Sequence, residues 1–192
     1  MAEIKSTLEL ALEKAEQYGR SSKDELLLDQ YREQARQLAV NYLREEGDLE
    51  AGIQNLPPGA QDAARTAAKE VLLRNITLPR EGELDPRQSR ALEGLLLLAS
   101  NKKAMARLKA EVEQIWQNFL MARNSAFQQL KANFSHSLDN MARAMEAQLR
   151  QKVRLDVEQL PQFQEEWRKF QGSLINQFEP ILDDRKAQML NL

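Results

Sequence analysis

The sequence predicts an all-α protein, and three observations carry this prediction. Ala, Leu, Glu, Gln, Lys and Arg, which are strong helix formers, dominate the 192 residues. Gly and Pro, which interrupt helices, number only 7 and 6. Apolar residues recur every three or four positions along most of the chain, which is the period of an amphipathic helix. We therefore expect an elongated helical bundle that ends in a long antiparallel helical hairpin.

The first 50 residues predict two helices that pack as an αα-hairpin. The first helix should run from about Glu3 to Tyr18, and Gly19 follows as a stop. Ser22 and Glu25 have the spacing of a capping box, so the second helix should begin there and end near Gly47.

Prolines and one polar loop divide the next 50 residues. Pro58 should open a third helix, whose alanines allow close packing against a neighbour; they are Ala60, Ala63, Ala64, Ala67 and Ala68. Residues 77–86 form the longest polar loop and indicate a subdomain boundary. Asp85 then caps a fourth helix that Pro86 opens and that continues through the apolar run at 95–98.

The stretch from Asn101 to about Leu155 has no Pro and no Gly and predicts one long helix. Its apolar stripe repeats every 3.7 residues or so. The stripe comprises Met105, Leu108, Val112, Ile115, Phe119, Ala122, Ala126, Leu130, Phe134, Leu138, Met141, Met145, Leu149 and Val153. Such a helix would be roughly 80 Å long, so we expect either an elongated molecule or a break near Ser125 or Ser135.

The last helix should begin at Leu160-Pro161 and be kinked by Pro180. Folded back, its roughly 30 residues can cover only about half of the long helix. We expect an N-terminal helical subdomain at residues 1–99 and a coiled-coil-like hairpin at residues 100–192. The uncovered stripe then requires residues 1–99 or another chain, which predicts a homo-oligomer.

Charge is unevenly distributed along the chain. Residues 1–50 carry 12 acidic and 7 basic side chains, residues 101–155 carry 4 and 10, and the whole chain has a net charge of −2. Lys109, Arg123, Lys131, Arg150 and Arg154 each follow a stripe position directly, so they line one flank of the stripe. This basic flank is interpreted either as a surface for nucleic acid or anionic lipid, or as charge matching at helix edges; the second is favoured.

Trp116 and Trp167 lie on or beside the stripes of the two C-terminal helices. They are interpreted as core residues or as part of an exposed groove for a partner. Together with the basic flank they form the candidate interaction surface.

Chemical sites are scarce in this sequence. With no cysteine, thiolate nucleophiles, disulfides and zinc–thiolate sites are excluded. The single histidine, His136, falls on the face opposite the stripe and is expected to face solvent. No phosphate-binding loop, calcium-binding loop or carboxylate–histidine metal pattern occurs. We expect neither an enzyme nor a bound cofactor or metal.

The opening residues, MAEIKSTLELALEK, follow the pattern M-x-E-I-x-S-x-L-E-x-A-L-E-K. This pattern resembles the start of a family of bacterial all-helical proteins of unknown function. The resemblance implies a bacterial cytoplasmic protein and supplies no functional residues.

The function expected from the sequence is that of a non-enzymatic helical interaction protein, an adaptor, chaperone-like or scaffold subunit. Its partners would be a second copy of itself or another protein. The alternative is a protein that binds nucleic acid or an anionic surface through the basic flank. The amino terminus has no apolar secretory signal, and the most apolar run, residues 94–99, is too short to span a membrane, so we expect a cytoplasmic location.

Overall fold

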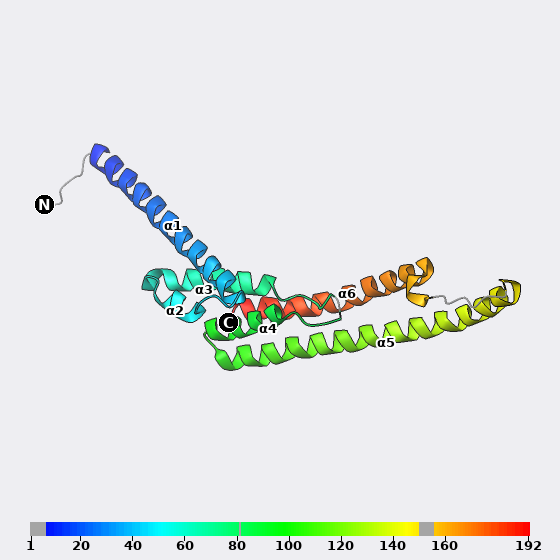
Figure 1. Ribbon diagram of the computed structural model, residues 1–192. Helices are drawn as coiled ribbons and strands as arrows, with labels where there is room; N and C mark the ends of the chain where they lie inside the picture. The colour runs from blue at the N-terminus through cyan, green and yellow to red at the C-terminus, as the bar shows by residue number, and fades with distance from the viewer. Residues whose placement is uncertain (1–6, 81, 150–155) are drawn as a thin grey trace. The chain divides into compact units, whose positions relative to one another are not determined.

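The computed structural model describes residues 7–80, 82–149 and 156–192, and the side chains of residues 24–80, 82–135 and 156–192. Over these residues the chain is all-helical, which confirms the predicted fold class (Figure 1). The helices are α1 (Thr7–Leu43), α2 (Leu49–Gln54), α3 (Pro58–Arg74), α4 (Pro86–Leu98), α5 (Lys102–Leu149) and α6 (Pro161–Leu190), with a short 3-10 helix at Val157–Gln159.

The contacts divide the chain into two units. The first unit is Met1–Asn75 with Arg90–Ser100, and the second is Ile76–Ser89 with Asn101–Leu192. The segment 76–89 thus groups with the C-terminal helices. The predicted division into a helical subdomain at residues 1–99 and a helical hairpin at residues 100–192 stays a prediction.

The predicted αα-hairpin in the first 50 residues is wrong. One continuous helix, α1, passes through Gly19 and through the expected cap at Ser22. A glycine in a helix interior costs only about 1 kcal/mol relative to alanine, and no proline occurs before Pro57. Helix formers on both sides therefore carry the helix through this glycine.

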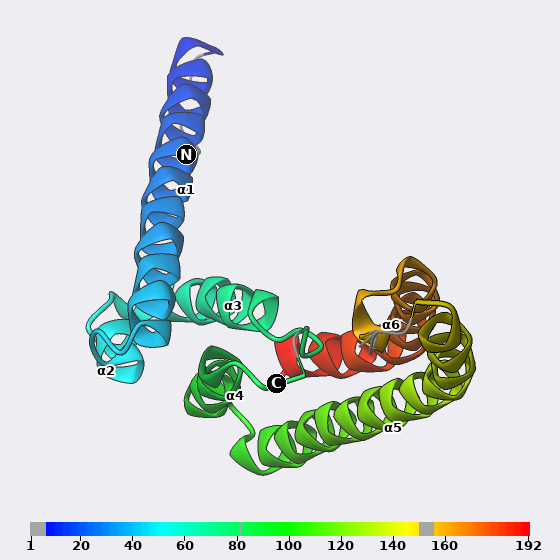
Figure 2. The same ribbon diagram turned by 45° about the vertical axis from the view of Figure 1, so that its right-hand side comes forward.

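The first unit is built where α3 packs on the C-terminal part of α1. Small buried side chains on both helices bring the two backbones close; they are Ala35 and Ala39 of α1 and Ala60, Ala64, Ala67 and Ala68 of α3. The sequence did not predict α2, which is capped by Asp48 through a 3.0 Å bond from the backbone N–H of Ala51. Figure 2 shows α2 and α3 at one end of α1, with the N-terminal part of α1 extending away from them.

The predicted helix starts at prolines and polar caps are confirmed. Pro58 opens α3 and Pro161 opens α6. The carboxylate of Asp85 accepts the backbone N–H of Arg87 at 2.9 Å at the start of α4. In the same way, the side-chain oxygen of Asn101 accepts the backbone N–H of Ala104 at 3.1 Å at the start of α5. Each cap satisfies a backbone donor that has no partner within its helix.

The helix α5 does not break at Ser125 or Ser135. The hydroxyl of Ser135 donates back to the carbonyl of Lys131 at 2.9 Å, so it satisfies itself within the helix. The apolar stripe of α5 is buried at Met105, Leu108, Val112 and Phe119. Between Val112 and Phe119, Trp116 is buried, whereas the predicted stripe member Ile115 is only half-buried. The core thus includes the residue beside the predicted one.

A glycine in α4 allows close packing inside the first unit. A Cβ atom at Gly94 would lie 2.9 Å from both Leu72 Cδ1 and Tyr42 Cε1. Gly94→Leu should therefore destabilise the first unit by about 1–3 kcal/mol through overpacking. Urea unfolding followed by circular dichroism measures this change.

The matched control is Gly172→Leu in α6, where nothing lies within 4 Å of a Cβ atom. Because leucine is the better helix former, this variant should gain about 0.5–1 kcal/mol. Equal effects at the two glycines would contradict the packing described for Gly94.

Candidate functional site

One backbone carbonyl ties a loop of the second unit to two helices. Trp116 Nε1 on α5 donates to the carbonyl oxygen of Thr77 at 2.9 Å. Gln88 Nε2 on α4 donates to the same oxygen at 2.9 Å and to Thr77 Oγ1 at 2.7 Å. Trp116 is 2% exposed and Gln88 is 6% exposed. Because a carbonyl oxygen has two lone pairs, these two donors saturate it and fix the loop.

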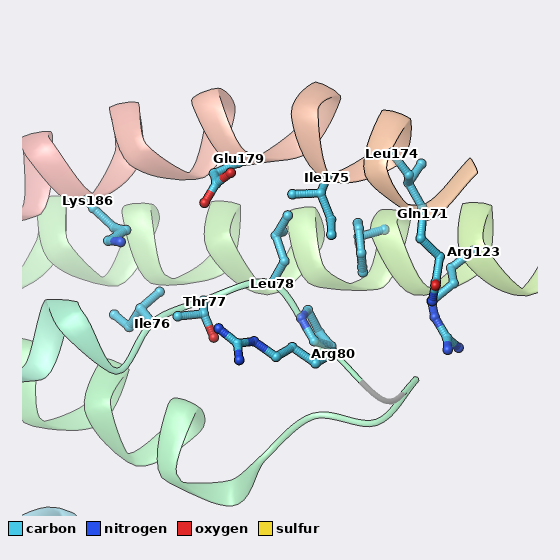
Figure 3. Close-up of a pocket in the computed structure, with 12 residues that line it drawn as sticks. Ile76, Thr77, Leu78, Arg80, Arg123, Gln171, Leu174, Ile175, Glu179 and Lys186 are labelled. Carbon is cyan, nitrogen blue, oxygen red and sulfur yellow. The ribbon is translucent and has the colours of Figure 1, made fainter. Parts of the chain in front are cut away.

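The loop that begins at Ile76 forms one wall of a cavity of about 340 Å³ (Figure 3). The other walls come from α5 and α6, and all lining residues belong to the second unit. Six lining side chains are apolar: Ile76, Leu78, Pro79, Phe119, Leu174 and Ile175. Four are charged: Arg80, Arg123, Glu179 and Lys186. The cavity therefore combines an apolar interior with an excess of positive charge.

Arg123, a member of the predicted basic flank, is held at one end of this cavity. Its guanidinium carbon lies 5.4 Å from the centre of the Trp167 ring, within cation–π range. Gly82 has a φ of +85°, and a Cβ atom there would lie 2.6 Å from Arg123 Nη1. The positive φ favours glycine at this position, and a larger residue would also require the Arg123 guanidinium to shift.

Lys131 lies on the same side of α5 and pairs with the C-terminal segment. Lys131 Nζ is 2.5 Å from Glu158 Oε1. The hydrogen bond from Lys131 to the Glu158 carboxylate, with the attraction of that charge, raises the pKa of Lys131. Lys109 instead pairs within α5, 3.5 Å from Glu113. The side chains of Arg150 and Arg154 lie outside the described residues.

Aromatic rings join α5 to α6 between these two basic residues. Phe127 packs edge-to-face on Phe163, at 5.6 Å between ring centres, and on Trp167, at 5.0 Å. Phe134 packs on Phe163 at 5.6 Å. Arg123, Phe127 and Lys131 are spaced four residues apart, so one side of α5 faces the C-terminal segment. Trp116 lies in the core, and Trp167 is half-buried.

The sequence prediction missed Thr77, Gln88 and Phe127. We call the contact of Trp116 and Gln88 with the Thr77 carbonyl the Thr77 node. In the sequence Trp116 lies 39 residues from Thr77 and Gln88 lies 11 residues from it, and no periodic pattern marks these contacts. Phe127 carried a usable signal, since it directly follows the stripe member Ala126 as Arg123 follows Ala122. The basic flank is defined by charge, and Phe127 lies at the same register of α5.

The structure provides no placement for the histidine, because the side chain of His136 lies outside the described residues. Among the residues described, no group of three or more His, Asp or Glu side chains could hold a metal ion. Within those same ranges, no helix is both long enough and apolar enough to cross a membrane.

Because Trp116 and Gln88 share the Thr77 carbonyl, their contributions to the free energy of unfolding should be coupled. Removing either donor alone leaves the oxygen with one partner, whereas removing both leaves a part-buried acceptor with none. Trp116→Phe combined with Gln88→Leu should therefore cost about 1 kcal/mol more than the sum of the two single changes. Urea unfolding of the four proteins of this cycle measures the coupling.

Strict additivity in that cycle would show that the two side chains do not share an acceptor. Hydrogen exchange of the backbone at residues 76–80 provides a second readout. It should accelerate strongly only in the double variant.

Comparison with known proteins assigns a family but no activity. No curated protein and no solved structure matches the chain. A family model described as a family of unknown function (DUF6657) matches residues 50–191, about three quarters of the chain. This match covers α3 to α6, including the Thr77 node, the cavity and the aromatic contacts. The chain therefore belongs to the DUF6657 family of unknown function.

Proposed function

We propose that this protein is a non-enzymatic helical interaction protein, an adaptor, chaperone-like or scaffold subunit that self-associates through its helices. The single observation that carries the proposal is that α5 is much longer than the helix that packs against it. It has 48 residues, and α6 has 30.

The contacts between α5 and α6 define where their pairing ends. Arg185 Nε lies 2.7 Å from Glu111 Oε2, the Phe119 and Phe178 rings are 5.5 Å apart, and Phe134 contacts Phe163. Residue numbers rise along α5 as they fall along α6, so the two helices are antiparallel. Since α6 begins at Pro161, the pairing reaches only to about Phe134.

Beyond this point α5 continues to Leu149, about 22 Å further (Figure 1). We call residues 135–149 the α5 extension. Burial of the stripe already declines before it, from fully buried Met105 and Val112 to half-buried Leu130 and Phe134. The sequence continues the stripe with Leu138, Met141, Met145 and Leu149, whose side chains lie outside the described residues. An isolated helix of this length is only marginally stable in water, which favours a partner.

The N-terminal part of α1 has the same character within the first unit. Among its described side chains, none is buried before Ala35, whereas Leu26 is 61% and Leu27 is 47% exposed. We call residues 7–34 the α1 extension. Figure 2 shows the N-terminal part of α1 extending away from α2 and α3. The chain thus contributes two helical segments that extend past the helices packed against α1 and α5.

Exposed apolar residues on the α1 extension favour a second copy of the chain as the partner. Leu26 and Leu27 are 61% and 47% exposed there, and the sequence continues the stripe through the α5 extension. Both extensions carry a small net negative charge, −3 over residues 7–34 and −1 over residues 135–149, so apolar contact and not charge would hold them together. We therefore propose that the α1 extension of one copy packs along the α5 extension of another.

The alternative, binding of nucleic acid or an anionic surface, depends on the basic flank. Arg123 stacks on Trp167 and Lys131 pairs with Glu158, so two members of the flank are engaged within the chain. No observation favours this alternative over protein association.

Self-association should be visible by sedimentation velocity as a rise in sedimentation coefficient with protein concentration. Leu26→Asp should weaken it by about tenfold, because the change replaces an exposed apolar side chain of the α1 extension with a charged one. High salt should not weaken it, since the two extensions carry net charges of the same sign, −3 and −1.

Met121→Asp is the matched control for this experiment. Met121 is 68% exposed on α5, and it precedes the α5 extension. This variant should associate like the unchanged protein. A chain that sediments as a monomer at all concentrations, or equal effects of the two changes, would contradict the proposed contact.

A further inference from the structure

We infer that the cavity between the loop at 76–80, α5 and α6 is a binding site for a small amphipathic carboxylate, a molecule with an apolar body that ends in one carboxylate. The cavity lies wholly within the second unit and is separate from the α1 and α5 extensions. The inference therefore stands independently of the proposed self-association.

The size of the cavity suits a small organic molecule. Its volume of about 340 Å³ falls at the lower end of the roughly 300–1,000 Å³ range of ligand sites. It corresponds to about eleven waters at ~30 Å³ each. Half of its twelve lining residues are apolar, and an apolar surface of this kind gains free energy when a ligand replaces water.

The charges around the cavity select an anion. Arg80, Arg123 and Lys186 contribute three positive charges, and Glu179 contributes one negative charge. Lys186 is already paired with Asp183 at 3.2 Å. Neither arginine has a carboxylate within ion-pair distance in the part of the chain that the structure describes. A guanidinium binds a carboxylate in a two-pronged geometry, which makes a carboxylate the best complement.

The arrangement of the side chains gives the ligand an orientation. Figure 3 shows the Gln171 amide and Arg123 at one end of the cavity, with Lys186 at the other end. Leu78 of the loop and Ile175 of α6 point toward each other between these ends. The carboxylate should lie at the Arg123 and Gln171 end, and the apolar body should lie between Leu78 and Ile175.

Two sets of contacts order this site in the absence of a ligand. The Trp167 ring, 5.4 Å from the Arg123 guanidinium carbon, restricts that side chain. The two hydrogen bonds to the Thr77 carbonyl hold the loop that carries Leu78. A site that is already ordered loses less conformational entropy on binding.

The direct test is isothermal titration calorimetry of the full chain with three ten-carbon probes. Decanoate supplies the carboxylate, decanol has the same chain without charge, and decyltrimethylammonium reverses the charge. Decanoate should bind at least about tenfold more tightly than decanol, and decyltrimethylammonium should bind more weakly than either. Equal binding of decanoate and decanol would overturn the inference.

Variants on α6 locate the site. Ile175 lines the cavity and is 40% exposed, whereas Ile181 is 46% exposed and does not line it. Ile175→Asp should weaken decanoate binding by about tenfold or more, because it places a like charge beside the ligand. Ile181→Asp should leave binding within about twofold. Equal effects of the two substitutions would place the ligand elsewhere and overturn the assignment.

Arg123→Gln separates the charge from the shape of the cavity. Glutamine keeps a polar side chain at this position and removes the charge, and circular dichroism checks that the fold stays intact. The variant should lose affinity for decanoate and keep its affinity for decanol. A loss of the same size for both probes would contradict a carboxylate-selective site.

Two sources supply this chemistry: a free carboxylic acid and the C-terminal residue of a peptide. A leucine-terminated tripeptide with a free carboxylate, compared with its amidated form, distinguishes them from each other. Tighter binding of decanoate assigns the free acid, and tighter binding of the free tripeptide assigns a peptide terminus. Equal binding of the free and amidated tripeptides, with no binding of decanoate, would overturn the role of the carboxylate.

Discussion

The backbone carbonyl of Thr77 is the interaction on which the second unit depends. Its oxygen accepts one hydrogen bond from Trp116 on α5 and one from Gln88 at the start of α4. A buried carbonyl without partners would cost free energy comparable to a lost hydrogen bond, so the loop stays where both donors reach it. This single contact places Leu78 and Pro79 against the core and gives the cavity its wall.

The cavity and the extensions follow from different physical causes. The cavity exists because a pinned loop meets two helices that are themselves joined by aromatic rings, including Phe127 on Trp167. The extensions exist because the lengths of the helices do not match, since α5 has 48 residues and α6 has 30. A loop held by polar contacts suits recognition of a small molecule, whereas an uncovered helix suits association with another helix. The proposed self-association and the proposed carboxylate site therefore depend on different parts of the chain.

Local signals predicted much of the fold, and long-range contacts limited the prediction of the site. Pro58, Asp85 with Pro86, Asn101 and Pro161 all mark helix starts because their chemistry acts within a few residues. Gly19 misled the prediction, since a glycine is a weak stop that good helix formers override. Thr77 could not be predicted, because its role depends on a tryptophan 39 residues away. The basic flank remains a prediction from the sequence, and the contacts of Arg123 with Trp167 and of Lys131 with Glu158 required the structure.

Hydrogen exchange of the two indole N–H groups, followed by NMR, tests the Thr77 node most directly. Trp116 Nε1 is bonded to the Thr77 carbonyl in the core, whereas Trp167 is half-buried and makes ring contacts. The Trp116 indole proton should exchange with solvent far more slowly than the Trp167 proton. Equally fast exchange of the two protons would contradict a loop fixed through Thr77.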